Sequence, residues 1–326
     1  MRESPLSMAV LGVSSLDDAM AFYGGVIGLT ASRRETLQGE GFEKHWALPS
    51  GSSAAAILFA AEDSKVGRVL AIKFNTEDRK TIPQPGDRTY RGLWNLNFYV
   101  DDIRATTKGL QAKGHTFWSE PVGYEVSAEA GQPVEVLFDG PDGLAINLVE
   151  LTGDENTAVG KLRKEVDEEG KTLTGFTPVS TTSHSIIDHD KALAFYQQVL
   201  GLTVMIDDVL DKPETNHFLD RPKGARTRAT FMTSPHPFGK IAMSYPLNYE
   251  APNKGDLAVA PNIGYLAQSF LVQDLNAALN TCVDIGAALY SPSVEISLPG
   301  IGARMAAIVR NPGSGALMEL IEEDPA

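Results

Sequence analysis

Residues 17–30, DDAMAFYGGVIGLT, return in the second half of the chain as residues 190–203, DKALAFYQQVLGLT. A second echo links residues 98–103, FYVDDI, with residues 270–275, FLVQDL. The same three residue types follow both of these segments at the same offsets, as Gly114, Ser119 and Val122 in the first half and as Gly286, Ser291 and Val294 in the second. Two unrelated local patterns that repeat at nearly one interval indicate an internal duplication.

Each half of the chain shows the same pattern twice. The pattern is one strand, then one helix, then three strands. In the first unit, residues 7–12 have strand character, and a helical periodicity over residues 15–24 places Leu16, Met20 and Tyr23 on one face. Residues 30–36, 44–48 and 54–60 follow as three expected strands. A new unit begins at residues 94–100, and the second half repeats both units. We therefore predict an α+β fold of four βαβββ modules.

A charged segment separates the two halves. Residues 153–175 are rich in Glu, Lys and Asp and carry little apolar periodicity, which is typical of a solvated linker with a short helix near residues 159–168. A chain of 326 residues with 43% hydrophobic content is expected to form about two domains. We predict two tandem domains, residues 1–152 and 176–326, each with two modules.

Composition and charge exclude several classes of function. The net charge of −14 argues against nucleic acid as a partner, because a phosphate backbone is bound by an excess of Lys and Arg. No apolar run approaches the ~20 residues that span a bilayer, and the N-terminus lacks the pattern of a signal peptide. We expect a cytoplasmic protein with no membrane partner, in which the single cysteine, Cys282, is a buried thiol.

The repeated segments resemble a known superfamily. The helix motif at residues 13–30 and 186–203, followed by the PDG-type turn and strand at residues 139–148 and 311–320, is similar to the vicinal oxygen chelate superfamily. This superfamily includes glyoxalases, extradiol ring-cleaving dioxygenases and metal-free proteins that sequester bleomycin-type antibiotics. The resemblance implies a small-molecule ligand or substrate bound in a cup of curled sheet, and it makes a homodimer a reasonable expectation.

The resemblance also implies where a metal ion would bind. In metal-using members a His on the first strand of a module and a Glu on its last strand converge on one divalent ion. The His position corresponds to Met8, Asn95, Thr181 and Ala267, and the Glu position to Asn147 and Glu319. Residues 54–60 and 240–245, taken as the last strands of modules 1 and 3, contain no acid. One carboxylate cannot hold iron, manganese or zinc against water, so we predict neither a metal nor another cofactor.

Strand alternation indicates which side chains face the cups. If Leu96, Phe98 and Val100 pack beneath the helix, their neighbours point into the concavity. The predicted substrate-binding residues are accordingly Asn95, Asn97, Tyr99, Asn147, Thr181, Ser183, Ser269 and Met8. Modules pair either as neighbours or as first with fourth and second with third. The second arrangement would place Met8 beside Glu319, and Asn95 with Asn147 beside Thr181.

Three residues are candidates for catalysis. Glu319 is expected to lie in a mostly apolar cup, where desolvation favours its protonated form and fits it to accept a proton. His45 and His217 lie near strands of modules 1 and 3, from which either could reach a cup. The leading hypothesis is a metal-independent enzyme that moves a proton beside a carbonyl of a small, aromatic or carbonyl-containing molecule, as an isomerase or lyase does. The alternatives are a non-catalytic protein that sequesters a small molecule such as an antibiotic, and an extradiol-type dioxygenase with displaced ligands.

Overall fold

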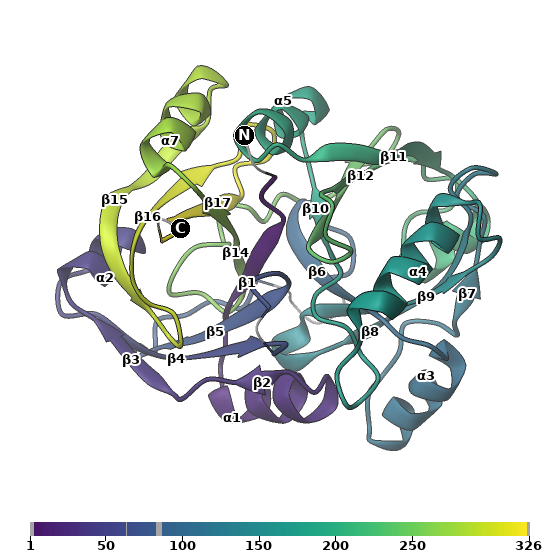
Figure 1. Ribbon diagram of the computed structural model, residues 1–326, viewed down its shortest axis with the longest axis horizontal. Helices are drawn as coiled ribbons and strands as arrows, with labels where there is room; N and C mark the ends of the chain where they lie inside the picture. Colours follow the sequence, from purple (N-terminus) through teal and green to yellow (C-terminus); the bar gives the residue numbers. More distant parts are fainter. Residues whose placement is uncertain (1–2, 63, 83–86, 325–326) are drawn as a thin grey trace.

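The fold consists of two curled sheets with helices packed around them (Figure 1). The computed structural model describes residues 3–62, 64–82 and 87–324. Within these residues one sheet has nine strands and the other has eight. The α+β fold of four modules is confirmed, and none of the described helices is long and apolar enough to cross a membrane.

The first half of the chain contains modules 1 and 2. Module 1 comprises β1 (Leu6–Gly12), α1 (Leu16–Ala19), η1 (Met20–Val26), β2 (Thr30–Ala31), β3 (Glu35–Gln38), α2 (Glu40–His45), β4 (Ser53–Ala60) and β5 (Arg68–Phe74). Module 2 comprises β6 (Gly92–Tyr99), α3 (Ile103–Ala112), β7 (Val122–Gly123), β8 (Gln132–Asp139), η2 (Pro141–Gly143) and β9 (Ala145–Thr152).

Helix α4 (Ala158–Glu169) connects the first half to modules 3 and 4. Module 3 comprises β10 (Thr181–Ser185), α5 (His189–Ala194), η3 (Phe195–Val199), β11 (Thr203–Leu210), α6 (Pro213–Phe218), β12 (Thr227–Thr233) and β13 (Lys240–Pro246). Module 4 comprises β14 (Gly264–Val272), α7 (Leu275–Asp284), β15 (Ala288–Leu298), β16 (Gly302–Arg310) and β17 (Leu317–Glu322).

The four main helices begin in the same way. Each N-cap side chain accepts a hydrogen bond from the backbone N–H three residues later: Ser15 in module 1, Asp102 in module 2, Asp188 in module 3 and Asp274 in module 4. This cap satisfies one of the backbone donors that a helix start leaves unpaired. The repeated caps fix the entry of each helix at the same point after the first strand of its module.

The modules pair first with fourth and second with third. Strand β1 runs antiparallel to β14, and β6 runs antiparallel to β10. The nine-stranded sheet therefore unites modules 1 and 4, and the eight-stranded sheet unites modules 2 and 3. We refer to the inner faces of these sheets as the 1+4 cup and the 2+3 cup. Each cup takes one module from either half of the chain.

The region between β3 and β5 differs from the prediction. Residues 44–48 were expected to form a strand, but helix α2 ends at His45 and a turn follows. The apolar residues Phe42 and Trp46 are spaced by one helical turn and are both buried, so the helical period prevails. Because this segment was counted as a strand, the true last strand of module 1, β5, was missed. The expected strand 30–36 is divided into β2 and β3, and Met20 is 37% exposed rather than buried.

The helix expected within the charged linker is confirmed as α4. Its residues Val159, Leu162 and Val166 are buried and join a cluster that includes Tyr99 and Leu151. The linker is therefore packed against the sheet of modules 2 and 3. The division into domains 1–152 and 176–326 stays a prediction about folding units.

The junction of β1 with β14 gives the first test. A Cβ on Gly12 would lie 2.0 Å from the backbone oxygen of Asn262, which precedes β14. We expect Gly12→Ala to lower the free energy of unfolding by about 1–3 kcal/mol, because the two modules must separate to accommodate the methyl group. Gly109 in α3 has no atom within 4 Å of the corresponding position, and Gly109→Ala is expected to raise the free energy of unfolding by about 0.5–1 kcal/mol. Urea denaturation of both variants measures these changes, and an unaltered Gly12→Ala protein would contradict the close packing.

Candidate functional site

The 1+4 cup is filled by apolar side chains. Its interior forms one cluster of buried residues that includes Met8, Val10, Leu70, Ile72, Ala267, Ile308, Leu317 and Ile321. The cluster extends to Phe42 and Trp46 of α2, which lies against β15 and covers this cup. The cup is therefore a packed core with few polar groups.

His45 and Glu319 form a buried pair inside the 1+4 cup. His45 Nε2 lies 2.7 Å from Glu319 Oε1, and both side chains are fully buried. The sequence analysis named both residues as catalytic candidates, and the structure joins them across the interface of modules 1 and 4. Three further polar atoms of this cup are buried without a hydrogen-bond partner, namely His45 Nδ1, Glu319 Oε2 and Ser269 Oγ.

A cavity of about 160 Å³ opens at the mouth of the 1+4 cup. Its walls are largely apolar and include Leu37, Phe42, Trp46, Leu70, Ile72 and Leu298. The described lining does not include His45 or Glu319, because Trp46 and its neighbours on α2 close the cup above the pair. A ligand in this cavity would meet apolar walls before it met the carboxylate.

The 2+3 cup holds a second cavity, whose walls are mostly apolar with a few polar side chains among them. Its volume is about 60 Å³. The polar residues that line it are Asn97, Tyr99, Tyr124, Glu135, Thr181 and Lys240. The alternation prediction is confirmed here, because Asn97 and Tyr99 face the cavity while Leu96, Phe98 and Val100 belong to the core under the helices. An enclosed space with a few convergent polar groups is the usual form of a small-molecule site.

Glu135 lies at the centre of the hydrogen bonds in the 2+3 cup. Its carboxyl group accepts a hydrogen bond of 2.7 Å from the Tyr124 hydroxyl and one of 2.6 Å from Asn147 Nδ2. Burial raises the pKa of Glu135 above its ordinary value, and these two donors offset part of that effect. Burial also raises the pKa of Tyr124, which keeps its proton and remains a donor. The side-chain oxygens of Asn97 and Asn147 are buried without a partner.

Lys240 places an amino group in the same cavity. The residue is 3% exposed at the start of β13, and its Nζ donates to the backbone oxygen of Pro237. Nζ lies 5.7 Å from the centroid of the Tyr99 ring. Burial lowers the pKa of Lys240 to about 7, and the more distant carboxylate of Glu165 compensates only in part. A buried carboxyl and a buried amine with displaced pKa values in one cavity are typical of a site of acid–base chemistry.

Helix α6 covers the 2+3 cup as α2 covers the 1+4 cup. Two residues after each helix comes a residue of positive φ, Ala47 at 52° after α2 and Asp220 at 49° after α6. When the two helices are aligned on these residues, Phe218 occupies the position that His45 has in α2. Phe218 stacks on Tyr124 with the ring centroids 5.4 Å apart. His217, which was expected to reach the cup, has an exposed side chain on α6, because the helix turns Phe218 inward in its stead.

The structure separates the predicted site residues into two groups. One group lies in modules 1 and 4 and comprises Glu319, Met8 and Ser269 of the sheet and His45 of helix α2. The other group lies in the sheet of modules 2 and 3 and comprises Asn95, Asn97, Tyr99, Asn147, Thr181 and Ser183. Asn95 accepts a hydrogen bond of 2.9 Å from the backbone of Ser183, which places these two residues at the seam of β6 and β10. The expected combination of Glu319 as base with Asn95, Asn147, Thr181 and Tyr99 as substrate ligands is therefore wrong for a single site.

The donors present do not fit the metal site that the resemblance implies. The register that pairs Ser269 with Glu319 pairs Asn97 with Asn147, Val10 with Leu70 and Ser183 with Ala242. Over both cups together, the last-strand positions thus supply one carboxylate, that of Glu319. The first-strand positions supply no imidazole. Among the described residues, no three His, Cys, Asp or Glu side chains gather where they could hold a metal ion.

Sequence reasoning missed Glu135, Tyr124 and Lys240. A signal for Glu135 was present, because it is the one charged residue within the strand segment PVEVLF and alternation turns it towards the cup. Lys240 begins a strand that was searched for acids, and its amine was not considered. Tyr124 lies in a loop after β7, where strand periodicity gives no direction for the side chain.

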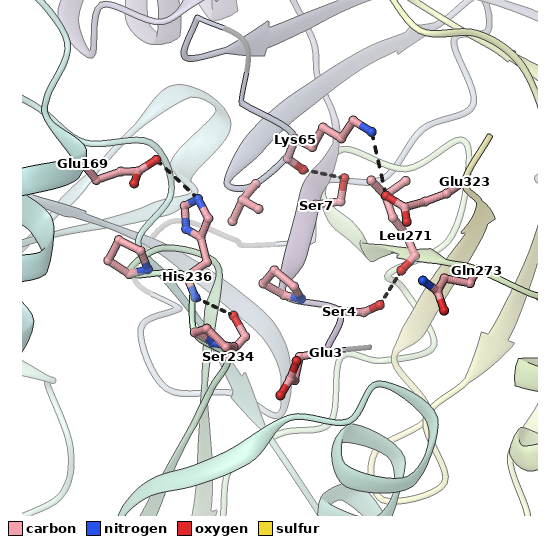
Figure 2. A pocket seen from close by; sticks show the side chains of 14 residues that line it. Glu3, Ser4, Ser7, Lys65, Glu169, Ser234, His236, Leu271, Gln273 and Glu323 are labelled. Carbon is pink, nitrogen blue, oxygen red and sulfur yellow. Dashed lines mark hydrogen bonds and ion pairs between the residues drawn. The ribbon is translucent and has the colours of Figure 1, made fainter. Parts of the chain in front are cut away.

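A third cavity, of about 430 Å³, lies between the two sheets near the N-terminal segment. Figure 2 shows its charged side chains arranged as pairs: His236 faces Glu169 at 3.6 Å, and Lys65 faces Glu323 at 3.9 Å. Glu3 and Ser4 border the same space. The predicted site residues lie elsewhere.

Comparison with known proteins agrees with this architecture. Residues 6–148 match the family model of the Glyoxalase/Bleomycin resistance protein/Dioxygenase superfamily. The comparison with curated proteins gave no match. Glyoxalase I from Zea mays has a similar structure with a TM-score of 0.62 and 16% identity, covering 98% of this chain and 92% of that chain. A putative dioxygenase from Bacillus subtilis subsp. subtilis str. 168 has a TM-score of 0.57 and 14% identity, covering 100% of this chain and 87% of that chain. At these identities the likeness shows a shared fold.

The buried pair of the 1+4 cup gives a test of its role in stability. His45→Leu leaves the carboxylate of Glu319 without its partner and is expected to lower the free energy of unfolding by about 3–5 kcal/mol. The double variant His45→Leu/Glu319→Leu removes both polar groups from an apolar cluster and is expected to recover most of this loss. Urea denaturation compares the two. A double variant as unstable as the single one would show that the pair itself holds the cup together.

The amine of the 2+3 cup gives a test with a defined pH dependence. Between pH 7 and the ordinary Lys value of 10.5, the unfolded chain binds a proton at Lys240 that the folded protein releases, so this residue's contribution to stability rises with pH. Lys240→Met is expected to be more stable than the wild type by more than about 1 kcal/mol at pH 6.5, with the difference shrinking towards pH 9. Thermal unfolding across this range measures it. A difference that grows with pH would mean that Lys240 is charged and well paired.

Proposed function

We propose that the protein is a metal-independent enzyme that moves a proton beside a carbonyl group. The chain belongs to the glyoxalase/bleomycin resistance/dioxygenase superfamily through residues 6–148. Among the described residues, its cups lack the metal donors of that superfamily. The observation that carries the proposal is the cavity of the 2+3 cup, in which Glu135, Tyr124, Lys240, Asn97 and Thr181 converge. The proposal assigns the chemistry to the 2+3 cup, whereas Glu319 belongs to the 1+4 cup.

Glu135 is the proposed proton carrier. Burial raises the pKa of this carboxyl group towards neutral pH. A group with a pKa nearer to neutral both accepts and returns a proton more efficiently. Tyr124 and Asn147 hold the carboxyl by hydrogen bonds and thereby orient the lone pair that takes the proton. Removing a proton from carbon next to a carbonyl sends negative charge to the carbonyl oxygen, which then needs donors.

The other polar side chains of the cavity are the proposed donors for that oxygen. Lys240 supplies N–H groups, Thr181 an O–H group and Asn97 an amide N–H group. In an enclosed site such fixed donors stabilise a developing oxyanion more strongly than water does. A single water occupies about 30 Å³ of liquid, so a cavity of about 60 Å³ favours a compact keto compound or aldehyde over a large aromatic substrate.

The His45–Glu319 pair is a second candidate for proton transfer. The contact of 2.7 Å between an imidazole and a carboxylate favours it, and the unpartnered atoms of the pair leave capacity for a ligand. The closed apolar cup above the pair weighs against it. Comparing Glu135→Gln with Glu319→Gln separates the two cups directly.

Proton exchange with solvent provides that comparison. The protein is incubated in D₂O with acetone, hydroxyacetone or pyruvate, and the loss of the α-proton signal is followed by ¹H NMR. We expect the wild type to exchange at least one of these probes above the buffer rate, and Glu135→Gln to be slower by about 10²–10⁴-fold. Tyr124→Phe is expected to be slowed to a lesser extent, since it removes one of the two donors that orient the carboxyl.

Glu129→Gln serves as the matched control, because this glutamate is exposed in the loop that leads into β8. Loss of exchange in Glu319→Gln, with Glu135→Gln unaffected, would assign the activity to the 1+4 cup. A wild type that binds a probe, returns it unchanged and exchanges no proton would instead favour the binding-protein alternative.

A further inference from the structure

The amino group of Lys240 is held in a setting that exposed lysines lack. It borders the cavity of the 2+3 cup, with a backbone oxygen as its hydrogen-bond acceptor and the Tyr99 ring alongside. The charge that acts on it favourably belongs to Glu165, which is on the exposed side of α4. Desolvation outweighs this charge, so a substantial fraction of the amine is neutral near pH 7 and carries a free lone pair.

The corresponding position of the other cup differs in chemistry. The register that pairs Thr181 with Lys240 pairs Met8 with Arg68 at the start of β5. Arg68 donates to the hydroxyl and to the backbone oxygen of Ser7. A guanidinium is not a nucleophile under these conditions, whereas a neutral amine is. Of the two cups, the 2+3 cup is thus the one that presents a reactive nitrogen.

When a proton leaves carbon, the electron pair of the C–H bond stays behind. The 2+3 cup therefore needs a group that accepts this electron pair. Metal ions commonly fill this role as Lewis acids, and no group of three metal donors is found in the part of the chain that the structure describes. A protonated imine formed on a lysine is an alternative electron acceptor, since it carries its positive charge directly on the bond next to the reacting carbon. Lys240 and Glu135 both line the same small cavity, so an imine on Lys240 would form in the space that the carboxyl of Glu135 borders.

We propose that Lys240 forms a covalent imine with the carbonyl carbon of the substrate, so that the class of substrate is a small aldehyde or ketone. This inference rests on the proposed function and names the chemistry of that same site. It makes Lys240 a nucleophile and not merely a donor to the carbonyl oxygen.

The steps balance without an oxidant or a reductant. The Nζ lone pair attacks the carbonyl carbon, the carbonyl π bond breaks, and a proton from nitrogen passes to the oxygen to give a carbinolamine. The protonated carboxyl of Glu135 then donates a proton to the hydroxyl, water leaves, and the nitrogen lone pair forms the protonated imine. The Glu135 carboxylate next removes a proton from the adjacent carbon, and the C–H electrons form an enamine. Return of a proton to carbon and addition of one water molecule release the product and restore Lys240.

Reductive trapping tests the proposal at the residue itself. The full chain is incubated at pH 7.5 with acetone or pyruvate and sodium cyanoborohydride, digested, and analysed by mass spectrometry. We expect a secondary amine on the peptide that contains Lys240, formed at least about tenfold faster than on exposed lysines, whose ordinary pKa near 10.4 keeps them protonated. Lys73, exposed on β5, is the internal reference in the same digest.

Matched variants give the remaining outcomes. Lys73→Met is expected to leave the trapping at Lys240 unchanged, whereas Lys240→Met and Lys240→Arg abolish it together with proton exchange. Thermal unfolding verifies that the Lys240 variants are folded. Preferential modification of other lysines, or proton exchange that persists in Lys240→Met, overturns the imine while leaving the proposed proton transfer intact. Trapping at Lys240 with no proton exchange of any probe supports the imine and removes the proposed function.

Discussion

The antiparallel pairing of β6 with β10, and of β1 with β14, decides which side chains share a cup. It joins module 2 to module 3 and module 1 to module 4, and every later feature of the site depends on this choice. Had neighbouring modules paired instead, Glu319 would share a sheet with Thr181. In the observed fold, Thr181 lies opposite Asn97, and Glu319 meets His45 of helix α2 in the other cup.

The two cups have diverged although they share one plan. One is packed with apolar side chains around a single His–Glu pair, and its covering helix is wedged against β15. The other keeps a carboxyl, an amine and several neutral donors around a small space. Burying Glu135 and Lys240 costs stability, because each loses hydration that its partners replace incompletely. Residues that weaken a fold in this way while facing one cavity are characteristic of functional sites, where stability and activity are in opposition.

Local patterns in the sequence predicted the parts of the structure that local physics controls. The duplicated helix motif and the strand alternation led to the four modules and to the inward direction of Asn97 and Tyr99. Module pairing was beyond such patterns, because it depends on contacts between strands far apart in the chain. Helix α2 was mistaken for a strand since its apolar residues suit either period over so short a segment. Glu135 and Lys240 were missed because the search followed the metal-ligand positions of the resemblance. Glu135 lies on β8, which carries none of these positions, and Lys240 lies on the last strand of module 3 at another position.

The charge state of Lys240 is the physical quantity on which this account depends most. A ¹⁵N NMR titration of the lysine side chains, with the Lys240 signal assigned by its loss in Lys240→Arg, measures that state directly. The account predicts that Nζ is half-protonated near pH 7, because burial lowers its pKa to about 7. An Nζ that stays protonated above pH 9 would contradict it, since the 2+3 cup would then hold an ordinary ammonium group in place of a reactive amine.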